Sequence, residues 1–109
     1  MADVLGAFEQ AVLLAIVRLG AGAYGRAILT DINDRLERDV AAGAVYATLD
    51  RLETKGLASS RIGSGTPQRG GRVRRYYSLT AAGIRALNDA KSATETIWRG
   101  LTWPLRVAQ

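Results

Sequence analysis

Five arginines in one glycine-rich stretch, residues 61–78, are the side chains whose type and spacing best define a chemistry. The stretch holds no acidic residue, whereas the other 91 residues carry ten basic and ten acidic side chains. The formal net charge of +5 therefore arises entirely within this segment. A guanidinium group can donate two hydrogen bonds to phosphate oxygens, and neutralising phosphates releases counterions from a nucleic acid. The pattern predicts a phosphate-binding hairpin that contains Arg61, Arg69, Arg72, Arg74 and Arg75.

The composition argues against most catalytic and metal chemistry. The chain has no cysteine and no histidine, which excludes disulfides, Cys/His zinc sites and histidine-based acid–base catalysis. Its acidic residues are scattered rather than paired, and no Gly-Lys-Ser/Thr follows the glycine-rich loop as it would in a nucleotide-binding loop. We therefore expect a protein that is not an enzyme and that uses no cofactor or metal.

Length and hydropathy indicate one small globular domain. With 109 residues, 48% of them apolar, the chain has room for a single modest core. Its longest apolar run, residues 11–17, is far too short to span a bilayer. Asp3 and Glu9 precede this run, where a signal peptide would carry positive charge. We expect a cytoplasmic protein with no membrane association.

Three predicted helices precede the hairpin in the sequence and should position it. Apolar residues recur at helical spacing in three successive segments, which predicts helices over residues 4–19, 24–36 and 42–55. The first is apolar on nearly every side, whereas the second has one apolar stripe and one polar side, as expected for a surface helix. Gly56 follows the third helix at the position where glycine commonly ends a helix.

The hydrophobic period then changes from that of a helix to that of a strand. Alternation predicts two strands, residues 57–62 and 73–79, joined by a long glycine-rich loop. Thr80 is a suitable N-cap for a last helix over residues 81–102, which ends before Pro104. Because side chains alternate along a strand, one of the adjacent residues Tyr76 and Tyr77 should face inward and the other outward.

This order predicts a mainly α fold with a small β-hairpin: a winged helix-turn-helix, residues 1–80, followed by a C-terminal dimerisation helix, residues 81–109. The second and third helices form the DNA-binding pair, and the basic hairpin is the wing. Small residues at the start of the third helix allow its N–H groups to approach a phosphate or the groove floor. The predicted contacts with double-stranded DNA are Gly43, Ala44, Tyr46, Ala47, Thr48, Arg51, Arg69, Arg72, Arg74 and Arg75.

Four motifs together resemble the PadR-like family of transcriptional regulators. They are LGxFExxVLLAI at residues 5–16, YG at 24–25, GAVYxTLxRLExKGL at 43–57, and GGRxRRYYxLTxxG at 70–83. The resemblance covers residues 4–102, and the single C-terminal helix is similar to the smaller branch of the family. It implies a homodimer, a repressor role at an operator with dyad symmetry and, in many members, release by a small molecule.

Several side chains allow two interpretations. Tyr46 can pack under the second helix, contact phosphate, or do both, since a buried ring can keep its hydroxyl at the surface. Arg51 can pair with Glu53 or with the neighbourhood of Asp50 as readily as it can reach a DNA groove. At the level of function, a winged helix that binds protein would carry a mixed-charge wing, which this chain lacks. An RNA-binding winged helix remains the alternative, since phosphate contacts do not distinguish the two polymers.

The first and last helices predict a homodimer. A helix that is apolar on nearly all sides needs more cover than one small domain supplies. The last helix has a heptad-like apolar stripe, and 22 residues at about 1.5 Å each give roughly 33 Å, longer than so small a domain can cover. An isologous dimer covers both surfaces. The predicted interface residues are Leu5, Leu13, Ile84, Leu87, Thr94, Trp98 and Leu101.

The two tryptophans add a candidate effector site. In the family that this chain resembles, multidrug-sensing members stack flat ligands on aromatic residues of the C-terminal helix. Trp98 and Trp103 are the matching candidates here, with a planar aromatic small molecule as the ligand. Dimer packing is the simpler role for Trp98, and Trp103 lies beside Pro104, where the helix should already be ending.

Overall fold

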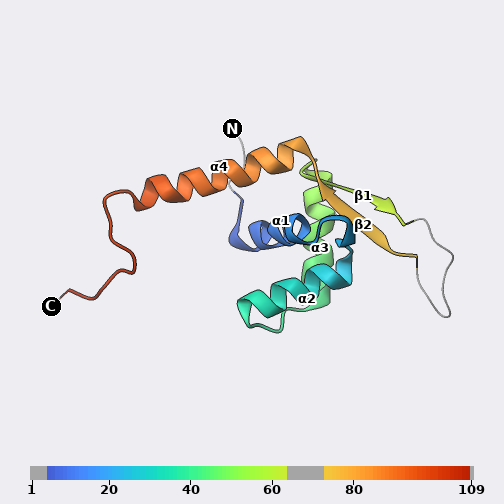
Figure 1. The fold of residues 1–109 in the computed structure, drawn as a ribbon, viewed down its shortest axis with the longest axis horizontal. Helices are drawn as coiled ribbons and strands as arrows, with labels where there is room; N and C mark the ends of the chain where they lie inside the picture. The colour runs from blue at the N-terminus through green and yellow to red at the C-terminus, as the bar shows by residue number, and fades with distance from the viewer. Residues whose placement is uncertain (1–4, 64–72, 109) are drawn as a thin grey trace.

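The computed structural model describes residues 5–63 and 73–108. It is a winged helix-turn-helix with an added C-terminal helix (Figure 1). The elements follow the order α1 (Ala7–Leu19), η1 (Gly20–Gly22), α2 (Gly25–Leu36), α3 (Ala42–Thr54), β1 (Ala58–Ile62), β2 (Arg75–Leu79) and α4 (Ala81–Trp98). The predicted fold class is confirmed. None of the described helices is long and apolar enough to cross a membrane.

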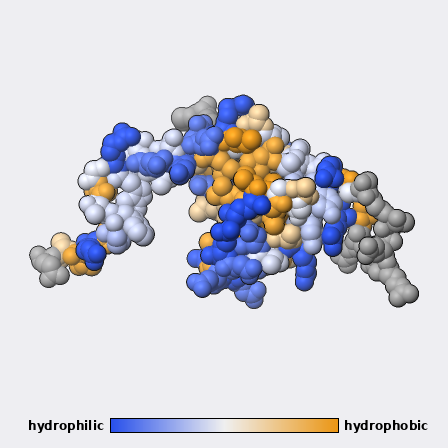
Figure 2. Space-filling model, viewed as in Figure 1, coloured by the Kyte–Doolittle hydropathy of each residue, from blue (hydrophilic) through white to orange (hydrophobic). Residues whose placement is uncertain are grey.

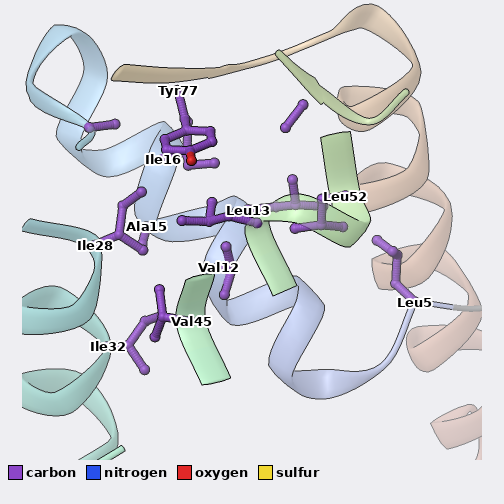
Figure 3. Close-up of a cluster of buried hydrophobic side chains, with 13 residues drawn as sticks. Leu5, Val12, Leu13, Ala15, Ile16, Ile28, Ile32, Val45, Leu52 and Tyr77 are labelled. Carbon is purple, nitrogen blue, oxygen red and sulfur yellow. The ribbon is translucent and has the colours of Figure 1, made fainter. Parts of the chain in front are cut away.

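One hydrophobic core lies where α1, α2, α3 and the hairpin meet (Figure 3). α1 occupies its centre because Val12, Leu13 and Ile16 project from several sides of the helix into neighbouring elements. The fully buried side chains of largest volume are Leu13, Ile28, Ile32, Leu49, Leu52, Val12 and Val45. A single chain therefore covers most of α1 by itself, and only Leu14 and Val17 remain exposed among its large apolar residues.

Two predicted interface residues belong to this core instead. Leu13 is fully buried, and Leu5 is 5% exposed. Figure 3 places Leu5 between the start of α1 and the ribbon of α4. Their assignment to a surface between subunits was wrong, because the chain's own elements already cover them. The inference from sequence failed here because hydropathy gives the apolar faces of a helix and not the partner that covers each face.

The turn between α2 and α3 is fixed by one asparagine. α2 ends at Leu36, and its C-cap residue Glu37 has a φ of 50°, in the left-handed region. Asn33 then accepts the Val40 backbone N–H through Oδ1 at 2.7 Å and the Arg38 N–H through its backbone carbonyl at 3.1 Å. These bonds satisfy backbone donors in the short link and set the direction in which α3 begins.

The two strands form an antiparallel hairpin in which Ala58 pairs with Leu79 and Ile62 with Arg75. The strand alternation is confirmed, since Tyr77 is 7% exposed and joins the core while Tyr76 is half-buried on the other face. The hairpin is also joined to the segment before α2. The Tyr77 N–H donates to the Ala23 carbonyl at 2.8 Å, and Tyr24 forms an isolated bridge with Tyr76. The root of the wing is therefore attached to the start of the helix-turn-helix.

α4 begins as predicted and ends early. Thr80 caps it by accepting the Gly83 N–H at 3.0 Å, and its hydroxyl donates to the Gly56 carbonyl at 2.7 Å. The helix stops at Trp98 rather than at residue 102, so its 18 residues span about 27 Å. Leu101 consequently lies beyond the helix. Residues 91–108, which we call the arm, are all exposed and extend away from the rest of the molecule (Figure 1).

Candidate nucleic-acid interface

The first turns of α3 present small, exposed side chains to solvent. Gly43, Ala44 and Ala47 are all exposed, and a Cβ atom added to Gly43 would meet nothing within 4 Å. Ala41, the N-cap residue, makes no side-chain cap hydrogen bond. The N-terminal N–H groups of a helix have no partner within the helix, and its dipole favours an anion. This end of α3 can therefore approach a phosphate or a base edge closely.

Tyr46 both packs and stays accessible. Its ring lies directly over Gly25 at the start of α2, where an added Cβ atom would overlap the ring and come within 2.9 Å of the Tyr46 hydroxyl oxygen. The residue is nevertheless 45% exposed. Gly25 thus lets α2 and α3 approach closely. Both interpretations open at the sequence level, packing and an outward hydroxyl, are compatible with this position.

Thr48 and Arg51 are engaged within the chain. Thr48 is only 2% exposed, so its side chain is part of the core and not of an outward face. Its hydroxyl accepts a hydrogen bond from Arg51 Nη2 at 3.1 Å. Arg51 Nε lies 3.9 Å from a carboxylate oxygen of Glu9, an acid of α1, rather than beside Glu53. The prediction that Thr48 contacts DNA through its side chain was wrong, because residue 48 lies on the buried stripe of α3.

Glu9 joins the start of α1 to the end of α3. It accepts the Gly6 N–H at 3.2 Å and Lys55 Nζ at 3.0 Å. Partial burial raises the pKa of Glu9, but the bonds from Lys55 and Gly6 and the charge of Arg51 outweigh this and hold the pKa below its ordinary value. Asp31 is similar: its contacts with Arg18 and then Arg35 outweigh partial burial and lower its pKa.

The root of the wing carries two arginines, each over a tyrosine ring, and the two rings touch each other; we call this group the wing-root ladder: Arg61, Tyr76, Tyr24 and Arg74. The Arg61 guanidinium lies 5.2 Å from the centre of the Tyr76 ring, and the Arg74 guanidinium lies 4.2 Å from the centre of the Tyr24 ring. The two rings meet edge to face with centres 5.8 Å apart. The Tyr76 hydroxyl, as a hydrogen-bond partner, and the nearby Tyr24 hydroxyl raise the pKa of Arg74.

The other predicted wing contacts differ in their surroundings. Arg75 Nη1 donates to Ser60 Oγ at 2.9 Å, and that hydroxyl donates to Glu53 at 2.6 Å. Arg75 is therefore exposed but bound to its own hairpin and, through Ser60, to α3. Arg69 and Arg72 lie outside the described residues.

Reasoning from the sequence missed three contributors to this surface. Tyr24 and Gly25 precede or begin α2; the family motif YG at 24–25 marked them, but no periodicity assigned them to a site. Arg61 was predicted to belong to the phosphate-binding hairpin but was left out of the predicted DNA contacts. A further signal was the pair of tyrosines at 76 and 77, since strand alternation leaves an outward ring for which no partner was sought.

Comparisons with known proteins now identify the chain. Residues 13–89 match the Transcriptional regulator PadR-like family. The protein belongs to this family. Its fold is shared with a PadR-like transcriptional regulator from Bacillus cereus, 24% identical, with a TM-score of 0.67 and 84% of each chain covered. A PadR family transcriptional regulator from Eggerthella lenta is 29% identical, with a TM-score of 0.65, over 82% of this chain and 75% of that one.

Another similar structure is RosR of H. salinarum, 26% identical, with a TM-score of 0.66 over 94% of this chain and 84% of that one. No curated protein sequence matches this chain. The family resemblance inferred from four motifs is thus confirmed, and with it the class of transcriptional regulators. Within residues 5–63 and 73–108, no group of three or more acidic residues is placed to hold a metal ion.

The remaining predicted interface and effector residues lie along α4 and the arm of this PadR-like protein. Leu87 is half-buried against the core. Ile84 is 52% exposed and Thr94 is exposed, and Trp98, the last residue of α4, is 36% exposed. Beyond the helix, Leu101 and Trp103 are more than half exposed. Within one chain, Ile84, Thr94, Trp98, Leu101 and Trp103 are thus exposed.

Proposed function

We propose that this PadR-like protein binds double-stranded DNA in a sequence-specific manner, with the start of α3 in the major groove and the wing along the adjacent backbone. The observation that supports this most directly is the adjacency of two surfaces. Tyr46 of α3 packs over Gly25, and Gly25 directly follows Tyr24 of the wing-root ladder, so the small-residue face of α3 and the ladder are neighbours. Base readout needs close backbone approach, and phosphate binding needs fixed cations, so the two surfaces are complementary.

The two surfaces should contribute differently. Arg72→Ala with Arg74→Ala should weaken binding to operator and random DNA alike, because phosphate contacts carry no sequence information. The slope of log affinity against log salt should flatten by about 0.9 for each phosphate that the variant no longer neutralises. Ala47→Glu places a carboxylate on the exposed face of α3 and should instead reduce the preference for operator over random DNA. A wing variant with reduced specificity and an unchanged salt slope would reverse these roles.

A mobility-shift assay tests the proposal as a whole. The purified protein is titrated against DNA from upstream of its own gene, with a scrambled duplex and an RNA duplex of the same sequence as competitors. Retention by the upstream DNA, with weaker competition from both others, supports operator recognition. Equal competition by the RNA duplex would favour an RNA-binding winged helix, and no shift at all would contradict nucleic-acid binding.

We propose further that the protein is a homodimer held by α4, the arm and α1, so that residues 81–109 serve association. The exposed large apolar residues support this: Leu14 and Val17 on α1, and Ile84, Ile97 and Trp98 on α4. An apolar groove of about 280 Å³ lies between α1 and α2 and includes Leu14 and Leu36. In Figure 2 apolar surface gathers at the centre of the face, where Figure 1 shows α1 beneath the start of α4. Sedimentation equilibrium should give twice the 11.7 kDa chain mass.

We propose that the homodimer acts as a repressor at an operator with dyad symmetry. Two recognition helices about one DNA turn apart would match the two half-sites of such an operator. We propose that a planar aromatic or cationic molecule near Trp98 changes this spacing and releases DNA. Two exposed indoles on facing helices, with Glu95 nearby, would provide a stacking slot for such a ligand. Tryptophan fluorescence titrated with planar dyes tests this, with Trp98→Ala as the control. Quenching without loss of the operator shift would leave Trp98 a packing residue.

A further inference from the structure

The wing-root ladder is more than a charged surface, because its members come from three places in the chain. Tyr24 is the N-cap residue of α2, Arg61 belongs to β1, and Arg74 and Tyr76 lie just before and within β2. An isolated backbone bridge joins Tyr24 to Tyr76, whose ring centres are 5.8 Å apart. The ladder is therefore built into the junction between the wing and the helix-turn-helix.

The rings of the ladder are themselves held in place. Gly63 lies against the Tyr76 ring, since an added Cβ atom would be 2.7 Å from Cε2 and 3.3 Å from the Arg74 carbonyl oxygen. The Gly63 N–H donates to that same carbonyl at 2.8 Å. Tyr24 makes no side-chain cap hydrogen bond to α2, so helix capping does not account for the position of its ring. Its described ring partners are Tyr76 and Arg74.

Each arginine in the ladder keeps its charge available. Arg61 and Arg74 are both exposed, and among the described residues no carboxylate forms a salt bridge with either. By contrast, Arg18, Arg35 and Arg51 each contact an acid within the chain. A guanidinium stacked on a ring loses motion while its edge N–H groups still point outward, so binding an anion afterwards costs less ordering of the side chain.

We propose that Tyr24 and Tyr76 are positioning residues that hold Arg61 and Arg74 as a preformed phosphate-binding pair at the wing root. This inference rests on the proposed DNA binding and adds how the charge is presented. The tyrosine rings act through the arginines they stack on, and they need no DNA contact of their own. Removing a ring should therefore matter only while its arginine is present.

A double-mutant cycle on the Tyr24–Arg74 pair tests this directly. Wild type, Tyr24→Leu, Arg74→Ala and the double variant are titrated against a fluorescent random-sequence duplex at several salt concentrations. Random DNA is chosen because phosphate contacts are the same on any sequence. An exposed cation–π contact converts to about a two- to five-fold change in affinity, so Tyr24→Leu should weaken binding by that factor. In the Arg74→Ala background the same change should have no further effect.

Conservative variants separate positioning from simple folding defects. Tyr24→Phe keeps the ring and should bind like wild type. Arg74→Lys keeps the charge but loses the flat stacking surface, and it should weaken binding about two- to five-fold. Arg85→Lys is the matched control, because Arg85 is exposed on α4 and belongs to neither proposed DNA-binding surface, and it should change binding less than about two-fold. Thermal melts verify that all variants are folded.

Different results would contradict the positioning role of the ladder and the proposed DNA binding. Additive losses in the double variant, or an Arg74→Lys variant that equals Arg85→Lys, would overturn the ladder as a positioning device while leaving DNA binding intact. A wild-type protein that binds neither random nor upstream duplex would instead overturn the proposed function. Loss of the Tyr24 effect in the Arg74→Ala background, with full binding by Tyr24→Phe, is the result expected.

Discussion

The helical body and the arm are stabilised in opposite ways. In the body, α1, α2, α3 and the hairpin bury the side chains of a common core, many of them completely. In α4 only Gly83 is buried, and every residue of the arm is exposed. Both regions are rich in apolar side chains, yet only the body covers them with its own chain. Apolar content alone therefore does not distinguish a core from a surface that needs a partner.

Two adjacent leucines of α1 give the sharpest contrast. Leu13 is fully buried, and Leu14 is 41% exposed. Leu13→Ala should lower the free energy of unfolding by about 2–5 kcal/mol, because it leaves a cavity in the centre of the core. Leu14→Ala should cost no more than about 0.5 kcal/mol in dilute protein, since that side chain touches solvent in the single chain.

Urea denaturation of both variants at low micromolar protein measures the difference. Val17→Ala, 57% exposed on the same helix and also at the proposed dimer interface, should behave like Leu14→Ala. If Leu14→Ala were as damaging as Leu13→Ala at every protein concentration, the exposed side of α1 would be part of the core after all. A cost for Leu14→Ala that grows with protein concentration would instead place that side chain in a contact between subunits.

The packing of the start of α4 on the body depends on one glycine. An added Cβ atom at Gly83 would overlap the Leu57 carbonyl oxygen and lie 3.0 Å from the carbonyl carbon. Backbone cannot move aside as a flexible side chain can, so Gly83→Ala should destabilise the protein by about 1–3 kcal/mol. Gly43→Ala is the matched control: it has open space around it and should be neutral or stabilising by up to about 1 kcal/mol. The melting temperatures of the two variants, measured side by side, test this difference. An equal fall in both would contradict the close packing of α4 on Leu57.

Periodicity predicted the helices and strands because each is defined locally. The three N-terminal helices begin and end within three residues of the predicted bounds, and Thr80 and Gly56 occupy the predicted cap positions. The predicted C-terminal limit of α4 failed because Pro104 bounds a helix from outside but does not require it to continue that far. Periodicity does not indicate which neighbouring element covers each apolar face. Leu13 was therefore assigned to an interface between subunits, although its own chain buries it completely.

The sequence predicted which elements form the site but not all of the contacts within it, because sequence patterns describe contiguous residues only. Charge counting identified the wing, and helix order identified α3, since both are properties of contiguous sequence. The ladder joins residues 24, 61, 74 and 76, which only the folded backbone brings together. Thr48 was misassigned because a helix turns by about 100° per residue, so a single position separates the buried stripe from the exposed face.

Association through the arm should make the stability of the protein depend on its concentration. If the arm packs in a homodimer, Tm should rise with protein concentration, because dimerisation favours the folded state by mass action. Ile97→Asp puts a charge at a side chain that is 76% exposed in the single chain. It should weaken association about ten-fold, equivalent to about 1.4 kcal/mol, and shift the rise in Tm to about ten-fold higher protein concentration. A wild-type Tm that stays constant over a hundred-fold concentration range would contradict the dimer, and an unchanged Ile97→Asp dimer would move the interface away from the arm.

The smallest expected effect compares a carboxylate of the body with one of the arm. Glu9 has a pKa held below its ordinary value of 4.5 in the folded protein by Lys55, Gly6 and Arg51, against partial burial. A depressed folded pKa contributes stability that is fully present above the unfolded value and is lost as pH falls through the folded one. Glu9→Gln should therefore cost about 1 kcal/mol near neutral pH, and the deficit should shrink below about pH 4.5. Glu95→Gln, on the exposed arm, should leave the stability curve nearly parallel to wild type. Urea midpoints between pH 3 and pH 7 for the three proteins measure this. A Glu9→Gln deficit that stayed constant down to pH 3 would mean that the Glu9 contacts stabilise the protein through shape alone and not through the charge of the carboxylate.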